Sequence, residues 1–262
     1  MSISFQVGTQ RIRFAGKTDV GQVRALNEDS ILVPKDLALA IVSDGMGGHA
    51  CGEVASALAV ETIESFYRGN HEIAAPTWPL RVPQIDVERD RVAAAIKLAN
   101  SRIYRAGRED PNKKGMGCTV DSLYVNQGRC FIGHVGDSRV YRLRGGQLGL
   151  VTEDHSMLND YRRMKEMSDE EIANFRHKNV VVRALGLGEE VGVDVIVEEA
   201  LVGDRYLLCS DGLNDMIDDQ AIAEILRQDK RLDAIAQQLV DAANEAGGKD
   251  NISALIVTID KA

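Results

Sequence analysis

The chain has 262 residues, of which 44% are hydrophobic and 27% charged, a composition typical of folded globular proteins and not of disordered tails. Its formal net charge of -9 argues against a large basic surface for phosphate backbones, so we expect no nucleic-acid partner. No apolar run approaches the roughly 18 residues of a membrane span. No basic region followed by an apolar core opens the chain. The sequence therefore predicts a cytoplasmic protein with no membrane partner.

The cysteines are isolated from one another and from histidines. No C-x-x-C pair and no zinc-like spacing occurs, so we expect neither a zinc site nor a disulfide framework. Small buried thiols in a reducing compartment are the prediction for all of them. They are Cys51, Cys118, Cys130 and Cys209.

The N-terminal half begins with strand patterns and changes to helix patterns. Residues 11–16 alternate in polarity like a half-buried strand, and 37–42 form an apolar run of buried-strand length. Apolar residues at helical spacing predict helices over 54–67 and 87–105. Residues 69–86 hold three of the five prolines, which predicts a loop.

Short strands dominate the middle of the chain. Residues 118–152 are predicted to form a meander of four strands. Its turn signals are Gln127-Gly128, Gly136-Asp137 and Gly145-Gly146.

Residues 154–180 differ because they are polar and poor in β-branched side chains. Ser168 followed by Glu171 resembles a capping box that opens a short helix. Beyond this segment, strands are predicted at 193–199, 205–210 and 252–259, and helices at 218–227 and 231–246.

The order of these elements defines the fold class. Strands occur at both ends and in the middle, with helices in two pairs, which predicts one domain of two sheets covered by helices. Strict β-α-β alternation is missing, so a doubly wound parallel sheet is not expected. No internal repeat or linker divides residues 1–262.

Several aspartates stand where predicted strands end or turn. Asp44 follows the apolar run LALAIVS, Asp211 follows YLLCS, Asp250 precedes the final strand, and Asp137 lies in a glycine turn. Each of them alone is explained as an ordinary turn residue. The alternative is that the strand ends converge and bring the carboxylates together.

If the strand ends converge, the negative charges of the clustered aspartates must be neutralised. Two unit charges about 4 Å apart repel by about 4 kcal/mol at an effective dielectric constant of 20. Protons or bound cations must therefore neutralise such a cluster. Hard oxygen ligands suit Mg²⁺ or Mn²⁺ better than zinc. Gly45, next to Asp44, leaves its carbonyl free to approach a metal.

The segment TDVGQVRALNEDS adds Arg24, Glu28 and Asp29 within a short stretch. An arginine near a metal pair offers a planar fork to a phosphate dianion. A solvated loop with an Arg24–Glu28 pair on one helical turn explains the same residues, and for this segment alone it is the simpler interpretation.

Taken together, these segments resemble one family. The chain closely resembles the metal-dependent protein phosphatases of the PPM (type 2C) family in their bacterial form, from about residue 11 to 259. Any single block would be weak, but the blocks occur in the family's order. They are T-D-V-G-x-V-R-x-x-N-E-D (18–29), V-S-D-G-M-G-G-H (42–49), G-C-T (117–119), H-V-G-D-S-R-x-Y (134–141), S-D-G-L (210–213) and D-N-I-S (250–253).

The resemblance implies an α+β fold, a four-layer α-β-β-α sandwich with two central antiparallel sheets flanked by helix pairs. It also implies two Mn²⁺ or Mg²⁺ ions between the sheets. By position in the motifs, Asp44 would bridge both ions, the Gly45 carbonyl would bind one, and Asp211 and Asp250 would complete the other.

The remaining motif residues take secondary roles by the same resemblance. Glu28 and Asp29 would act through metal-bound waters, and Arg24 would hold the substrate phosphate. Asp137 would join Asp211 at a third, weaker metal site. Residues 154–180 match the position of the family's flap.

The implied reaction is direct attack of a metal-activated water on phosphoserine or phosphothreonine of proteins. Met46 stands where eukaryotic relatives have a histidine proposed as general acid, so a metal-bound water is the expected proton donor, and His49 is expected to be structural.

The expected partners are phosphorylated proteins, in particular a bacterial Ser/Thr kinase or its targets, and the expected state is a monomer. The alternatives are a non-catalytic pseudophosphatase or metal-binding interaction module, and a phosphatase of small phosphoesters or of a regulator's phosphoserine.

Overall fold

The computed structural model describes residues 3–34, 36–47, 51–69, 84–164 and 180–262. The predicted capping-box helix at Ser168, the residue His49 and most of the proline-rich segment 69–86 lie outside these ranges.

Two antiparallel sheets of six strands each form the centre of the described part of the chain. The first has the order β1 (Ile3–Val7), β2 (Gln10–Asp19), β12 (Ile252–Lys261), β11 (Arg205–Cys209), β8 (Arg139–Arg144) and β9 (Gln147–Leu150). The second has the order β10 (Asp194–Glu199), β7 (Arg129–Val135), β6 (Val120–Asn126), β4 (Leu39–Met46) and β3 (Asp29–Leu32), with β5 (Gly117–Cys118) paired to β4.

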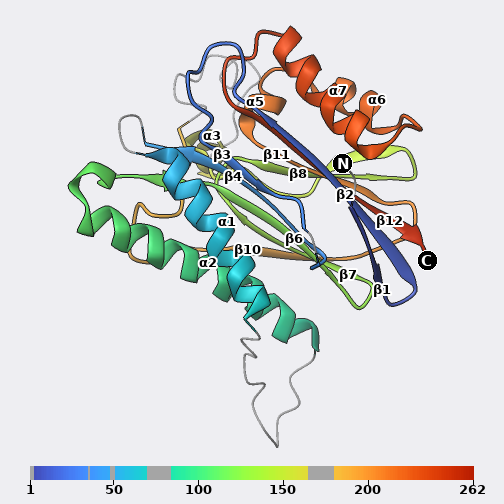
Figure 1. Ribbon diagram of the computed structural model, residues 1–262, viewed down its shortest axis with the longest axis horizontal. Helices are drawn as coiled ribbons and strands as arrows, with labels where there is room; N and C mark the ends of the chain where they lie inside the picture. Colours follow the sequence, from blue (N-terminus) through green and yellow to red (C-terminus); the bar gives the residue numbers. More distant parts are fainter. Residues whose placement is uncertain (1–2, 35, 48–50, 70–83, 165–179) are drawn as a thin grey trace, which may run out of the picture.

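Helix pairs cover the outer faces of both sheets (Figure 1). The helices α1 (Gly52–Arg68) and α2 (Gln84–Glu109) pack on the second sheet, and α6 (Asp219–Leu226) and α7 (Leu232–Glu245) cover the first. The predicted four-layer α-β-β-α arrangement is therefore confirmed. Shorter helices are η1 (Pro111–Lys113), α3 (Met157–Met164) and α5 (Asp211–Asn214).

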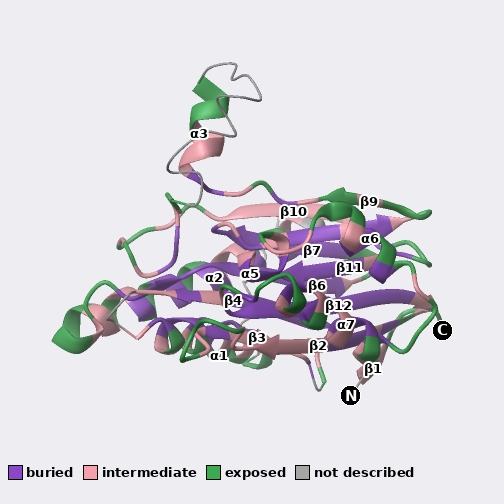
Figure 2. Ribbon diagram, turned by 90° about the horizontal axis from the view of Figure 1, so that it is seen from above, coloured by how far each residue is buried: buried purple, intermediate pink, exposed green. Residues whose placement is uncertain are grey.

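Three apolar layers separate the four structural layers. In β4, Leu39 and Ile41 pack under α1 and α2, whereas Ala40 and Val42 lie between the sheets. Both faces of each sheet are covered, so the central strands β4, β6, β7 and β12 are buried at most positions. Figure 2 shows this as strands that are buried along most of their length, whereas α3 stands apart at one end of the sandwich.

The predicted meander over 118–152 is wrong in one respect. β6 and β7 pair in the second sheet, but β8 and β9 pair in the first, so the chain crosses between sheets at Gly136-Asp137. Gly136 has a φ of 119°, a left-handed conformation that favours glycine. Turn chemistry alone does not distinguish such a crossing from a hairpin.

Candidate active site

A cavity of about 390 Å³ gathers most of the predicted site residues at one end of the two sheets. The ends of β4 and β11, the start of β12 and the β7–β8 crossing all reach it. The residues that line it are Arg24, Glu28, Asp44, Gly45, Met46, Gly47, Thr119, Asp137, Val181, Asp211 and Asp250.

Asp44 lies within β4 and not beyond its end, because the strand continues to Met46. Its N–H donates to Thr119 Oγ1 at 3.0 Å, and its carbonyl accepts from the Thr119 N–H at 2.8 Å. These bonds fix the backbone of Asp44. Burial, followed by the charges of the neighbouring aspartates, raises the pKa of Asp44 well above its ordinary value.

Gly45 is required by close packing against the start of α1. A Cβ built on Gly45 would lie 2.6 Å from the Glu28 carbonyl oxygen and closer still to the backbone of Gly52. The Gly45 N–H donates to that Glu28 oxygen at 3.1 Å. Glu28 in turn accepts from the Gly52 N–H through Oε1 at 3.2 Å, so its side chain caps the first turn of α1.

Asp211 and Asp250 lie just outside two neighbouring strands of the first sheet, Asp211 after the end of β11 and Asp250 before the start of β12, and both line the cavity. Asp211 opens α5, and burial followed by the charge of Asp250 raises its pKa to about 6. Asp211 Oδ1 is buried and has no hydrogen-bond partner among the described residues. Asp250 Oδ2 forms an ion pair with Arg24 Nη2 at 2.6 Å.

Asp29 does not line the cavity. Its carboxyl group is buried, and Oδ2 accepts from the hydroxyls of Ser210 (2.7 Å) and Ser253 (2.6 Å). Oδ1 is buried and has no partner in the described ranges. Burial is the largest cause that raises its pKa to about 7, and the charges of Asp211 and Asp250 add to it. Asp29 therefore supports the site through two hydroxyl groups.

Arg24 lies in a non-helical segment, so the interpretation of an Arg24–Glu28 helical pair is wrong. Asn251 holds this segment. Its Nδ2 donates to the carbonyls of Val20 (3.0 Å) and Leu26 (2.9 Å), and its Oδ1 accepts from the Glu28 N–H at 2.8 Å. Neither Asn251 nor Thr119 was assigned a role from the sequence, although both belong to the motif blocks.

Asp137 extends the acidic cluster toward α3. Burial, followed by the charge of Asp211, raises its pKa to about 7. A second cavity, of about 490 Å³, shares Asp137 and Asp211 with the first and is also lined by Arg162 and Arg163 of α3. Met46 lines the first cavity and supplies no ionisable group there.

A family model described as protein phosphatase 2C matches residues 21–255. The chain belongs to the protein phosphatase 2C family. It is 35% identical over 247 residues to the serine/threonine phosphatase stp of Listeria monocytogenes, covering 93% of this chain and 94% of the relative.

Solved structures agree with this family assignment. The serine/threonine phosphatase PstP/Ppp of Mycobacterium tuberculosis superimposes with a TM-score of 0.81 at 33% identity, covering 95% of this chain and 99% of that one. A catalytic domain of PstP in complex with two manganese ions gives a TM-score of 0.80 at 33% identity, with the same coverage. The relatives are named as enzymes, so a non-catalytic module is not favoured.

The carboxyl groups of this type 2C phosphatase offer the donors that a hard cation requires. Asp29 Oδ1 and Asp211 Oδ1 are buried oxygens without a described partner. After burial, the charges of neighbouring carboxylates raise the pKa values of both groups, and a bound cation would offset that repulsion. Within the described ranges, no group of three or more His, Cys, Asp or Glu side chains has the spacing of a metal site.

Proposed function

We propose that this chain hydrolyses phosphoserine and phosphothreonine on proteins in a metal-dependent reaction. The observation that carries the proposal is the cavity in which Arg24 faces Asp44, Asp211 and Asp250. Family membership supports the same activity. Other acidic clusters bind cations, but a guanidinium beside one adds a matching partner for a phosphate dianion.

The roles of the individual residues follow from their positions. Asp44, the Gly45 carbonyl, Asp211 and Asp250 would hold two Mn²⁺ or Mg²⁺ ions, and Asp137 would contribute to a third site. A bound metal pair supplies an activated water and neutralises charge on the phosphoryl group.

The other site residues orient the substrate and the ligands. Arg24 binds the phosphate oxygens once it leaves Asp250. Glu28 holds the start of α1 against Gly45 and would orient a water bound to the metal pair. Asp29 would orient such a water from its buried position.

Substrate selection belongs to the surface around this cavity. We propose that residues 154–180 act as a flap of a single catalytic domain over 1–262, since Val181 and α3 border the two cavities. Partner proteins would include a Ser/Thr kinase or its targets. None of the described helices has the length and apolar character needed to cross a bilayer. The monomeric state and the cytoplasmic location stay predictions of the sequence.

The test is hydrolysis of a phosphothreonine peptide by purified protein. We expect turnover with Mn²⁺, none with excess EDTA, and none in Asp44→Asn with Mn²⁺. Activity that survives chelation, or an active Asp44→Asn variant, would refute the metal-dependent proposal. Comparison with p-nitrophenyl phosphate and nucleotides separates a protein phosphatase from an enzyme for small phosphoesters.

A further inference from the structure

A buried histidine lies at the start of the proposed flap and contacts the glycine beside Asp137, and the function described so far does not use it. His155 is 3% exposed and follows Asp154, just before α3. Its backbone N–H donates to the Gly136 carbonyl at 2.7 Å, and its ring Nδ1 accepts from the Gly136 N–H at 3.0 Å. One residue thus satisfies both backbone groups of the glycine that precedes Asp137.

The partners of His155 define its tautomer. Because Gly136 N–H is a donor, Nδ1 must be the unprotonated nitrogen, and Nε2 carries the hydrogen. Nε2 then donates to Asp194 Oδ2 at 3.0 Å. Arg183 Nη1 lies 2.8 Å from Nε2, but both nitrogens carry hydrogens in this tautomer, so this contact is not a hydrogen bond. Arg183 acts on the ring through Asp194, because Nη1 donates to Asp194 Oδ1 at 3.0 Å and holds the carboxylate in place.

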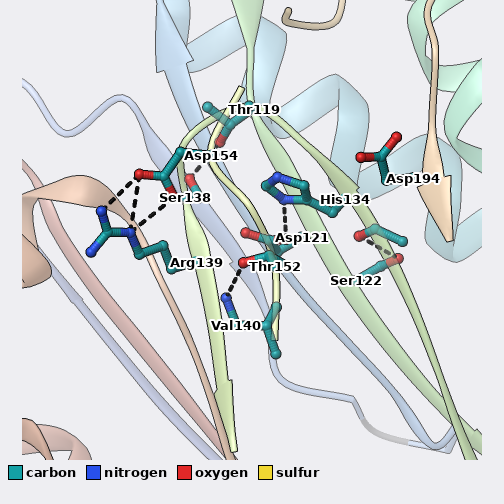
Figure 3. Close-up of polar contacts among 12 residues, drawn as sticks. Thr119, Asp121, Ser122, His134, Ser138, Arg139, Val140, Thr152, Asp154 and Asp194 are labelled. Atoms are coloured by element: carbon teal, nitrogen blue, oxygen red, sulfur yellow. Dashed lines mark hydrogen bonds and ion pairs between the residues drawn. The ribbon is translucent and has the colours of Figure 1, made fainter. Parts of the chain in front are cut away.

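A second histidine packs against the first. The ring centroids of His134 and His155 are 4.6 Å apart. His134 lies between Asp121 Oδ1 (2.8 Å) and the Glu153 carbonyl (3.0 Å), and Figure 3 shows it pointing at Asp121. These partners raise the pKa of His134 despite its burial, whereas burial and the neighbouring His134 lower the pKa of His155. His155 is thereby kept neutral.

His155 also closes the base of the flap. Its carbonyl accepts from the Val182 N–H at 2.9 Å, and the next residue, Ser156, forms a bridge with Val181, which lines the active-site cavity. On its other side, Gly136 packs so closely on Thr119 that a Cβ there would clash with the threonine side chain. Packing is therefore continuous from the flap base to the residue that fixes the backbone of Asp44.

We propose that His155 is a positioning residue that fixes the backbone from which Asp137 reaches into the cavity and ties it to the base of the flap. The role presumes the proposed phosphatase activity but uses a separate part of the structure. His155 itself lines neither of the two cavities. Its effect passes through Gly136. Removing Nδ1, the acceptor for the Gly136 N–H, should therefore raise the metal requirement of the enzyme in the same way as removing the Asp137 carboxylate.

The first experiment is a double-mutant cycle on phosphopeptide hydrolysis at several Mn²⁺ concentrations. We expect His155→Leu and Asp137→Asn each to raise the Mn²⁺ concentration for half-maximal activity about tenfold, and the double variant to lose little more than either single variant. Tyr206→Phe, which removes one partly buried hydrogen bond from β11 to Glu198 of β10, is the control and should leave the metal requirement unchanged. Additive losses would overturn the proposal.

The second experiment observes the metal-free protein. His155→Asn places an amide oxygen near the position of Nδ1, so we expect it to retain the Gly136 amide resonance near its wild-type shift, whereas His155→Leu moves it. Asp194→Ala keeps the His155 ring but removes the acceptor of its Nε2, so we expect it also to shift the Gly136 amide resonance. Because the Asp194 side chain is half-exposed, this variant should fold even if His155→Leu does not. A Gly136 resonance unmoved in Asp194→Ala and in a folded His155→Leu would refute the role. An inactive wild type with these shifts would instead refute only the proposed function.

Discussion

Burial in a cluster of like charges raises the pKa values of several aspartates in this site. Asp29 and Asp137 have pKa values raised to about 7 and Asp211 to about 6, and burial is the largest cause for all three. Each folded-state pKa lies above the ordinary value of 3.8, so the folded protein binds more protons than the unfolded chain between about pH 4 and 7. The stability that these protons provide is therefore lost as the pH rises through this window.

The first prediction concerns the metal-free protein. In EDTA, the melting temperature should fall as the pH rises from 5 to 8, because the carboxyl groups ionise without a compensating charge. Thermal unfolding at fixed ionic strength measures this. Asp29→Asn should flatten the pH dependence, since an amide does not ionise and still accepts from Ser210 and Ser253. Equal slopes for wild type and variant would contradict the assignment.

Arg24 gives the second prediction. Arg24→Ala should raise KM for a phosphopeptide and lower kcat, with about a hundredfold loss of kcat/KM, because a phosphate clamp acts in both the bound and transition states. Arg24→Lys should recover only part of this loss, since it keeps the charge but not the planar fork. Unchanged KM in both variants would remove Arg24 from phosphate binding.

Apolar side chains flank this arginine and give the third prediction. Val23 and Leu26 are 69% and 67% exposed. Leu26→Ser should raise KM for phosphopeptides with an apolar residue beside the phosphothreonine by about threefold to tenfold, because contact with the peptide is lost. KM for p-nitrophenyl phosphate should not change. A parallel change for both substrates would show that the substitution disturbs Arg24 itself.

Among the structural elements, the segment 20–28 depends on one buried amide. Asn251→Ala removes three hydrogen bonds, to Val20, Leu26 and Glu28. We expect a loss of about 2 kcal/mol or more in the free energy of unfolding, because buried backbone groups are left unpaired, together with a higher KM. Urea denaturation and peptide kinetics measure the two effects. Asn126→Ala, which removes a bond to Glu88 far from the cavity, should lower stability without raising KM.

The long elements were predictable because their patterns are local. The predicted helices over 54–67 and 231–246 match α1 (Gly52–Arg68) and α7 (Leu232–Glu245), since each buries one periodic stripe against a sheet. β3 (Asp29–Leu32) was missed because its first residues resemble a polar loop. It becomes a strand by pairing with β4, a long-range contact that no local pattern records.

The site was predictable only as a set of motif residues. The sequence motifs identified Asp44, Asp211 and Asp250, and the structure brings them to one cavity. The burial of Asp29 under two serine hydroxyls was not predictable, because it depends on how β3 lies against the start of β12. The clamp made by Asn251 was missed for the same reason.

At the scale of the whole molecule, cations should act as a structural element. Mn²⁺ should raise the melting temperature, because the folded carboxyl cluster binds it better than the open chain does. At a hundredfold excess over Kd the stabilisation is about 2.7 kcal/mol. Asp44→Asn should show a much smaller shift under the same conditions. Equal shifts for wild type and Asp44→Asn at millimolar Mn²⁺ would place the stabilising ion elsewhere.

The bridge between Ser156 and Val181 holds together the two ends of the proposed flap. We therefore expect that the stretch between these residues can be exchanged for one of different length without moving either sheet. Grafting the corresponding stretch from a relative onto these two anchor points should therefore transfer preference among protein substrates and leave hydrolysis of p-nitrophenyl phosphate at the recipient's rate.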